Sequence, residues 1–148
     1  MHLLGAWRLK LDISPCARHR PLMVSTVSLV ALGGAVGAAL RYLAGLGVTR
    51  LLGHQEFPLA IITVNVIGSF LMGVFVVAAA HKGLTYLSPF VMTGLLGGFT
   101  TFSAFSLESA NMIERGAFGQ AALYVFLSVG LSVGGLFLGL WSARGVFA

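Results

Sequence analysis

The chain has 148 residues, of which 57% are hydrophobic and only 9% are charged, and its mean hydropathy is +0.96. A soluble domain usually carries about 25% charged residues, so this composition excludes an ordinary soluble fold and indicates a membrane protein. The nine Lys and Arg against four Asp and Glu give a net charge of +5. These residues are scattered between apolar blocks and form no basic patch, which argues against nucleic acid as a partner.

The first 22 residues differ from the rest of the chain because charged residues interrupt them repeatedly, so they lack the apolar core of a signal peptide. A second methionine, Met23, follows this segment directly. Two interpretations stay open: translation starts at Met23, or the segment is a disordered tail. A cleaved targeting segment is a weaker alternative. The predicted organisation is an N-terminal tail over residues 1–22 and a single transmembrane domain over residues 23–148.

Four apolar blocks follow, separated by short linkers that contain the charged residues. The blocks are Ser25–Leu46, Pro58–His81, Leu87–Leu107 and Ala117–Trp141. Each is long enough to cross a bilayer as a helix, which takes about 20 residues. Continuous apolar runs also exclude a barrel, whose strands alternate in polarity. The sequence therefore predicts an all-α polytopic membrane protein with four transmembrane helices.

The basic residues do not determine the orientation of these helices in the membrane. Lys82 and Arg144 lie on one predicted side, and Arg50 and Arg115 lie on the other. The positive-inside rule therefore gives little instruction without the N-terminal tail. Such a chain can insert in both orientations, which allows an antiparallel dimer. Glycine patterns in the first and fourth blocks suit helix association, but packing between subunits and packing within one subunit both stay open.

Polar residues inside the first two spans are the first candidates for function, since a buried polar group is costly without a partner. Arg41 lies near the end of the first span, where it either attracts an anion or extends to the lipid headgroups. Asn65 and Ser69 in the second span are four residues apart and share a helix face. Asn65 either holds helices together or lines a polar path.

The third span contains the segment GGFTTFSAFS, Gly97–Ser106. Two adjacent glycines followed by two β-branched threonines predict a break in the helix near residues 97–101. A break frees backbone carbonyls, which at membrane depth must be buried in protein, line water or hold an ion. After it, Phe102, Phe105 and Ser106 come together, and the positive edges of the phenyl rings can line a passage for an anion. The alternative is that both rings only pack in the core or face lipid.

In the fourth span, Tyr124, Ser128 and Ser132 recur at a spacing of four and form one stripe of hydroxyls. Each serine alone is explained by a hydrogen bond to its own helix, but three aligned hydroxyls suggest donors along a path. No acidic residue lies in the middle of any predicted span, which argues against proton-coupled export of organic cations. The histidines lack the spacing of metal ligands or catalytic groups, so an enzyme is not expected.

These residues together resemble the Fluc (CrcB-type) fluoride channels, and the resemblance covers all four spans in order. The motifs that carry it are GGAVGAALRYL (Gly33–Leu43), TVNVIGSF (Thr63–Phe70), GGFTTFSAFS (Gly97–Ser106) and the hydroxyl stripe of the fourth span. The family usually has a polar residue one turn before the asparagine of the second span, where this chain has Ile61. The long N-terminal tail is also atypical of the family.

The resemblance implies an antiparallel, dual-topology homodimer with two fluoride pores and a structural sodium ion at its centre. The implied pore residues are Asn65, Phe102, Phe105, Ser106, Tyr124, Ser128 and Ser132. Arg41 corresponds to an arginine in the vestibule of the pore. The carbonyls of Gly97 and Thr100 correspond to the sodium ligands, two from each subunit.

The predicted function is a passive, selective channel that exports cytoplasmic fluoride across the bacterial inner membrane. Fluoride enters cells as the neutral acid and is trapped as the anion, so a channel in a cell with a negative interior lets it out. Two alternatives from other classes stay open at this point. One is a small multidrug exporter of dual topology, and the other is a membrane assembly factor that transports nothing.

Overall fold

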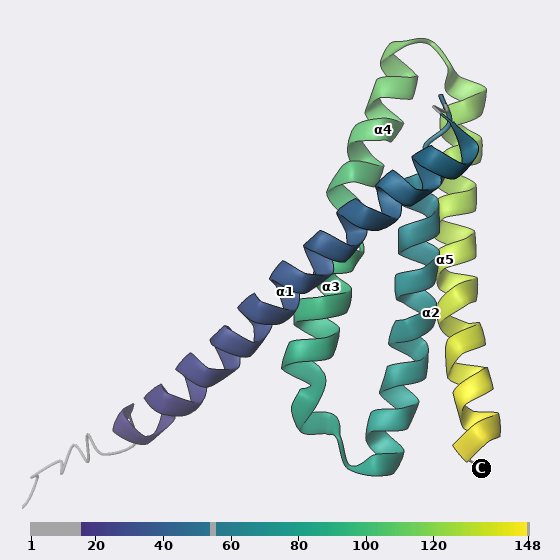
Figure 1. Ribbon diagram of the computed structural model, residues 1–148. Helices are drawn as coiled ribbons and strands as arrows, with labels where there is room; N and C mark the ends of the chain where they lie inside the picture. Colours follow the sequence, from purple (N-terminus) through teal and green to yellow (C-terminus); the bar gives the residue numbers. More distant parts are fainter. Residues whose placement is uncertain (1–15, 54–55, 148) are drawn as a thin grey trace, which may run out of the picture.

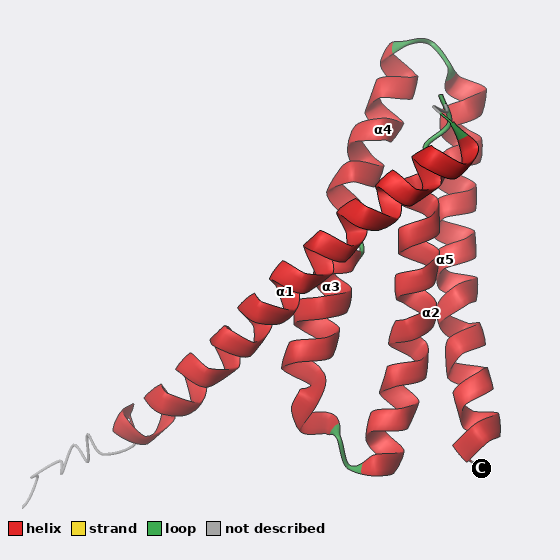
Figure 2. Ribbon diagram, viewed as in Figure 1, coloured by secondary structure: helices red, strands yellow, loops and turns green. Residues whose placement is uncertain are grey.

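The structure is a computed structural model that describes residues 16–53 and 56–147, and these residues form only helices and the turns between them (Figures 1 and 2). The elements in chain order are α1 (Cys16–Leu52), α2 (Leu59–Lys82), η1 (Thr85–Leu87), η2 (Pro89–Leu96), α3 (Gly97–Phe99), α4 (Phe102–Glu114) and α5 (Phe118–Phe147). The expected all-α class is therefore confirmed.

Four segments are long and apolar enough to cross a membrane. They are Met23–Leu52, Leu59–Lys82, Thr85–Glu114 and Phe118–Phe147. The expected second span agrees with α2 to within one residue at each end, whereas the other three spans extend several residues beyond the expected blocks at one end or both. Helix α1 begins at Cys16 and continues through residue 23, and residues 1–15 of the expected tail lie outside the described residues.

Helices α2 and α5 lie side by side along most of their length (Figure 1). Glycine makes this approach feasible, because a Cβ atom on Gly73 would clash with the carbonyl of Leu136, and one on Gly139 would clash with the carbonyl of Phe70. By contrast, a Cβ on Gly134 would meet nothing within 4 Å. Of the glycine pattern in the last span, Gly139 therefore serves packing within the subunit, while Gly134 lies on an uncovered surface.

Helix α1 crosses the third span at an angle, and its N-terminal half extends away from the other helices (Figure 1). The crossing is again a contact of backbone on backbone. A Cβ on Gly33 would clash with the carbonyl of Phe90, and one on Gly37 would clash with the carbonyl of Leu95. Two glycines one turn apart therefore seat α1 on η2 and α3, directly before the break in the third span.

The third span is broken where the sequence predicts. Helix α3 ends at Phe99, Thr100 is extended (φ −79°, ψ 159°), Thr101 is also extended (φ −149°, ψ 110°), and α4 begins at Phe102. The first part of the span is a π-helix over Pro89–Leu96, which was not predicted from the sequence. The extended pair Thr100–Thr101 is the only interruption between η2 and the end of α4, so it alone connects the two halves of the span.

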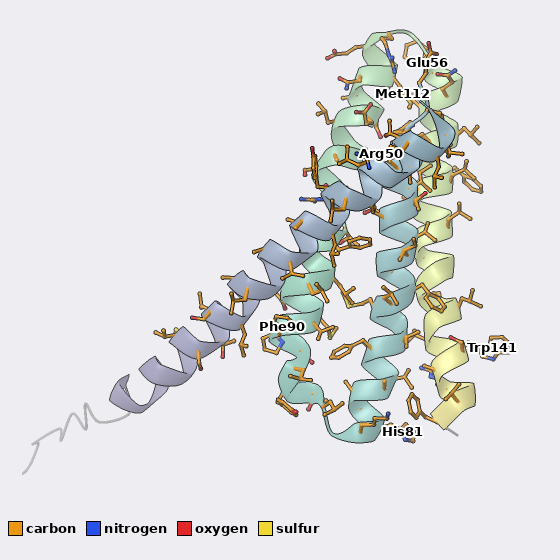
Figure 3. All side chains as sticks on the ribbon, in the orientation of Figure 1. Arg50, Glu56, His81, Phe90, Met112 and Trp141 are labelled. Carbon is orange, nitrogen blue, oxygen red and sulfur yellow. The ribbon has the colours of Figure 1, made fainter. Side chains whose placement is uncertain are left out.

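The buried core is small and lies near one end of the molecule, where α4 turns back into α5. Met112 and Tyr124 are fully buried there, and Met112 sits within this end in Figure 3. Outside this core, large apolar side chains are uncovered: Phe102 is 78% exposed, and Trp141 is 74% exposed and projects away from α5 in Figure 3. Such surfaces require lipid or another protein surface against them.

Candidate functional site

The site is centred on the break in the third span, where Asn65 of α2 binds the backbone of Thr101 at two points. The N–H of Thr101 donates to Asn65 Oδ1 at 2.8 Å, and Asn65 Nδ2 donates to the carbonyl of Thr101 at 3.2 Å. Only an amide side chain offers a donor and an acceptor side by side, as a peptide group does. Asn65 thus pairs with the extended residue as a neighbouring strand would, and one of its two amide hydrogens remains available.

The break removes the usual helical donors from the carbonyls at the end of α3 and from that of Thr100. In a continuous helix the N–H of residue i+4 donates to the carbonyl of residue i. Here the N–H of Thr101, which would serve Gly97, goes to Asn65. The N–H of Ala104, which would serve Thr100, donates instead to Thr101 Oγ1 at 3.2 Å, where it caps the start of α4. The residues expected to hold sodium, Gly97 and Thr100, are among those so affected, and hard cations prefer oxygen ligands, so both residues fit the ion.

Arg41 of α1 approaches the same break from the other side. Its Nη1 donates to the carbonyl of Thr100 at 3.2 Å, which uses one of the two lone pairs of that oxygen. Arg41 also lines a pocket of about 440 Å³ together with Ile61 and Thr101. The expected vestibule arginine therefore does lie in an open pocket. Ile61, the departure from the family pattern, faces this pocket rather than the one that contains Asn65.

A second pocket of about 370 Å³ lies between α2, the break and α5. It brings together five of the seven expected pore residues, which come from three different spans. The expected pore residues that line it are Asn65, Phe102, Phe105, Ser128 and Ser132. Thr101 lines both pockets, so the two are separated only by the extended segment of the third span.

Three aromatic rings form a series that begins at this pocket, and the first two of them, Phe102 and Phe105, line it. The ring centroids of Phe102 and Phe105 are 5.3 Å apart, and those of Phe105 and Tyr124 are 5.4 Å apart, with the planes tilted in both pairs. Tilted rings at this spacing present edges as well as faces to their surroundings. The outermost ring, Phe102, is uncovered, and the innermost, Tyr124, is buried.

Two of the expected hydroxyls are buried without a regular hydrogen-bond partner. Tyr124 Oη and Ser128 Oγ are shielded from solvent, and apart from each other neither has a hydrogen-bond partner in the described part of the chain. A buried polar group without a partner costs about 1–3 kcal/mol, so such groups call for an explanation such as a bound ion or water. Ser128 lines the pocket, whereas Tyr124 lies behind Phe105 and does not.

Two expected pore residues, Tyr124 and Ser106, do not line the pocket. Ser106 is exposed, and its Oγ donates to the carbonyl of Phe102 at 2.9 Å in its own helix, so the structure does not place it in the pocket. Conversely, Ser69 lines the pocket although it was not assigned to the site. Its spacing of four residues from Asn65 was the available signal for this assignment.

Comparisons with a family model and with individual known proteins point to the same family. Residues 28–140 match the family described as "CrcB-like protein, Camphor Resistance (CrcB)". A protein of Ruegeria sp. (strain TM1040) is 66% identical over 124 residues, which cover 84% of this chain and 98% of the relative. One of Roseobacter denitrificans is 66% identical over 125 residues, covering 84% and 99%. One of Caulobacter vibrioides is 52% identical over 123 residues, covering 81% and 96%. All three are named "Fluoride-specific ion channel FluC".

Proposed function

The chain belongs to the CrcB-like family, and from this premise we propose that it is a passive channel through which cytoplasmic fluoride leaves the cell. It is a multi-pass protein of the bacterial inner membrane and a channel rather than an enzyme. The observation that carries the proposal is the convergence of phenyl rings, an amide and hydroxyls from three spans on one pocket of about 370 Å³.

The chemistry of that pocket suits a small, strongly hydrated anion. Fluoride gives up its water only to closely placed hydrogen-bond donors, and Asn65 and the hydroxyls of Ser128 and Ser132 supply them along one wall. The ring edges of Phe102 and Phe105 add weak positive potential without a fixed charge that would trap the ion. Arg41, in the adjoining pocket, raises the local concentration of anions near the entrance.

The proposal extends to an antiparallel homodimer with two pores. Phe102 lines the pocket but is 78% exposed in the single chain, so the wall it belongs to is incomplete until another surface covers it. The open glycines Gly130 and Gly134 of α5 offer a surface where a second helix can approach closely. Without residues 1–22, the basic residues at the two ends are nearly balanced and favour neither orientation, which suits an antiparallel pair.

Sodium completes the proposed assembly as a structural ion held between the chains by the carbonyls of Gly97 and Thr100. The ion, when bound, supplies a fixed positive charge that joins the two breaks. The residues of the chain leave these carbonyls without helical donors, because Asn65 and Thr101 accept the N–H groups that would otherwise bind them. Arg41 donates to one lone pair of the Thr100 oxygen. The other lone pair of that oxygen stays available.

Ion efflux from liposomes tests the function directly. Vesicles containing the purified dimer are loaded with potassium fluoride or potassium chloride, and valinomycin carries the balancing potassium. We expect rapid release of fluoride and retention of chloride. Release of neither anion by verified dimers would support the assembly-factor alternative, and release that requires a proton gradient would support an exporter.

Tyr124 gives a prediction in which stability and flux separate. Replacing it with Phe removes a buried hydroxyl that has no partner apart from Ser128 in the described residues, so we expect the thermal stability to be unchanged or higher by about 1 kcal/mol. Fluoride efflux should fall, because the hydroxyl one turn before Ser128, which lines the pocket, is lost. Thermal unfolding and efflux of the same preparation measure both quantities. A variant with lower stability and normal efflux would contradict the role of Tyr124 as a donor.

The proposed dimer surface is tested with two glycines of the same helix. Gly134→Leu fills open space on α5 in the single chain, so we expect it to weaken the dimer while each chain still folds. Gly139→Leu clashes with the carbonyl of Phe70 and should instead prevent the packing of α5 on α2. Single-molecule counting of subunits in liposomes distinguishes the two results. An unaltered dimer in Gly134→Leu would place the interface elsewhere.

A further inference from the structure

The break in the third span could be read as a local property of Gly97, Gly98 and the two threonines. The contacts indicate a different cause, because the extended Thr101 is held from outside its own helix. Asn65 makes both of its hydrogen bonds to the two backbone groups of this one residue, at 2.8 and 3.2 Å. Thr101 is also only 8% exposed, so the loss of these bonds would be costly.

The hydrogen bond at 2.8 Å has a consequence for Gly97. A backbone N–H makes one strong hydrogen bond, so the N–H of Thr101 cannot serve Asn65 Oδ1 and the Gly97 carbonyl together. If Asn65 lost its acceptor, the nearest return for this N–H would be the helical bond to Gly97. Gly97 is itself helical (φ −65°, ψ −35°), so that bond would engage its carbonyl in its present direction and extend α3 toward Thr101.

We propose that Asn65 is the positioning residue of the cation site: by binding the N–H of Thr101, it keeps the carbonyl of Gly97 available to the ion. This inference rests on the sodium ion of the proposed function and adds a role to a residue otherwise assigned to the pore. The amide has the capacity for both, since one Nδ2 hydrogen is left for the pocket that Asn65 also lines. Asn65 thereby connects the sodium site to the fluoride path.

The test measures sodium binding rather than flux. The dimer is purified in detergent, sodium chloride is exchanged for choline chloride at constant ionic strength, and the thermal midpoint is recorded at each sodium concentration. A ligand that binds only the folded protein stabilises it in proportion to ln(1 + L/Kd), where L is the free ligand concentration, so the sodium concentration at which the midpoint begins to rise reports affinity. Leucine has neither donor nor acceptor, so Asn65→Leu should need at least about tenfold more sodium for the same rise of the thermal midpoint.

Two further variants make the result specific. Asn65→Asp keeps an acceptor for the N–H of Thr101, and any negative charge favours a cation, so it should need no more sodium than the unaltered protein. Ser69→Ala changes a residue on the same face and in the same pocket that makes no hydrogen bond to another described residue, and it should leave the sodium requirement unchanged. The inference is overturned if Asn65→Leu has the same sodium requirement as the unaltered protein. It is also overturned if the thermal midpoint of the unaltered protein does not depend on sodium. Neither result affects the efflux test, which judges the channel function by itself.

A spectroscopic measurement covers the case in which Asn65→Leu does not assemble. Thr100 and Thr101 are the only consecutive threonines in the chain. Labelling threonine with ¹³C at the carbonyl and ¹⁵N at the amide therefore gives one correlated NMR signal that reports the Thr100 carbonyl and the Thr101 amide. The unaltered protein and Asn65→Asp should both show slow hydrogen exchange of this amide and an extended Thr100. Rapid exchange in the unaltered protein would exclude the hydrogen bond on which the inference depends.

Discussion

Phe102→Ile is expected to lower fluoride efflux by at least about tenfold, which corresponds to ~1.4 kcal/mol in barrier height, while the dimer still assembles. Isoleucine keeps an apolar side chain of comparable bulk but has no ring, so the positive edges at the outer end of the aromatic series disappear. The centroid of the Phe102 ring is 5.3 Å from that of Phe105, so the remaining ring also loses the neighbour that fixes its tilt. Efflux from liposomes, normalised to the number of reconstituted dimers, measures the effect.

A matched control is available on the last span. Phe126 is 75% exposed, comparable to Phe102, but it does not line the pocket. Phe126→Ile should therefore leave efflux within about twofold of the unaltered protein, a difference of under ~0.5 kcal/mol. Equal losses in the two variants would show that exposed rings act on assembly or lipid contact rather than on the ion.

Gly37→Ala should have the largest effect on stability among the single methyl additions to the first span, a loss of about 3 kcal/mol. The new Cβ would clash with the carbonyl of Leu95 and would come within 2.9 Å of the backbone nitrogen of Phe99. Both contacts are backbone atoms of η2 and α3, which cannot rotate aside as a flexible side chain could. Helix α1 must then move away from the third span.

Gly45→Ala on the same helix is the control, since a Cβ there would meet nothing within 4 Å. An alanine in a helix is favoured over glycine by up to about 1 kcal/mol, so this variant should be at least as stable as the unaltered protein. The thermal midpoint and the yield of monodisperse protein measure both variants. Similar midpoints for the two would mean that α1 is not seated by its glycines.

The number of spans and the place of the break followed from the sequence because both depend on local composition. Four apolar blocks between charged linkers predict four spanning helices, and glycines beside β-branched threonines predict where one of these helices ends. Spacing placed Phe102 with Phe105 and Ser128 with Ser132, since side chains one turn apart share a helix face, whereas the convergence of the two pairs on one pocket was implied by the family resemblance.

Other features depend on how the helices are aligned with one another, which periodicity does not reveal. Asn65 was assigned to a pore or to helix packing, but its pairing with Thr101 requires the register of α2 against the third span. The roles of Gly134 and Gly139 were likewise undecided, because each depends on what lies opposite. The exclusion of Ser106 from the pocket reflects the common hydrogen bond of a helical serine to its own backbone, which competed with the expected role.

The extended segment of the third span also has a consequence for how substitutions combine. Arg41 binds the carbonyl of Thr100 and Asn65 binds the carbonyl of Thr101, so two residues from different helices hold adjacent peptide groups. Once one of the two side chains is removed, the segment can shift, and the hydrogen bond of the other side chain is weakened. Residues that share one structural element in this way show non-additive free energies. Arg41 and Asn65 should therefore be energetically coupled. The double variant should lower the free energy of unfolding by less than the sum of the losses in the two single variants.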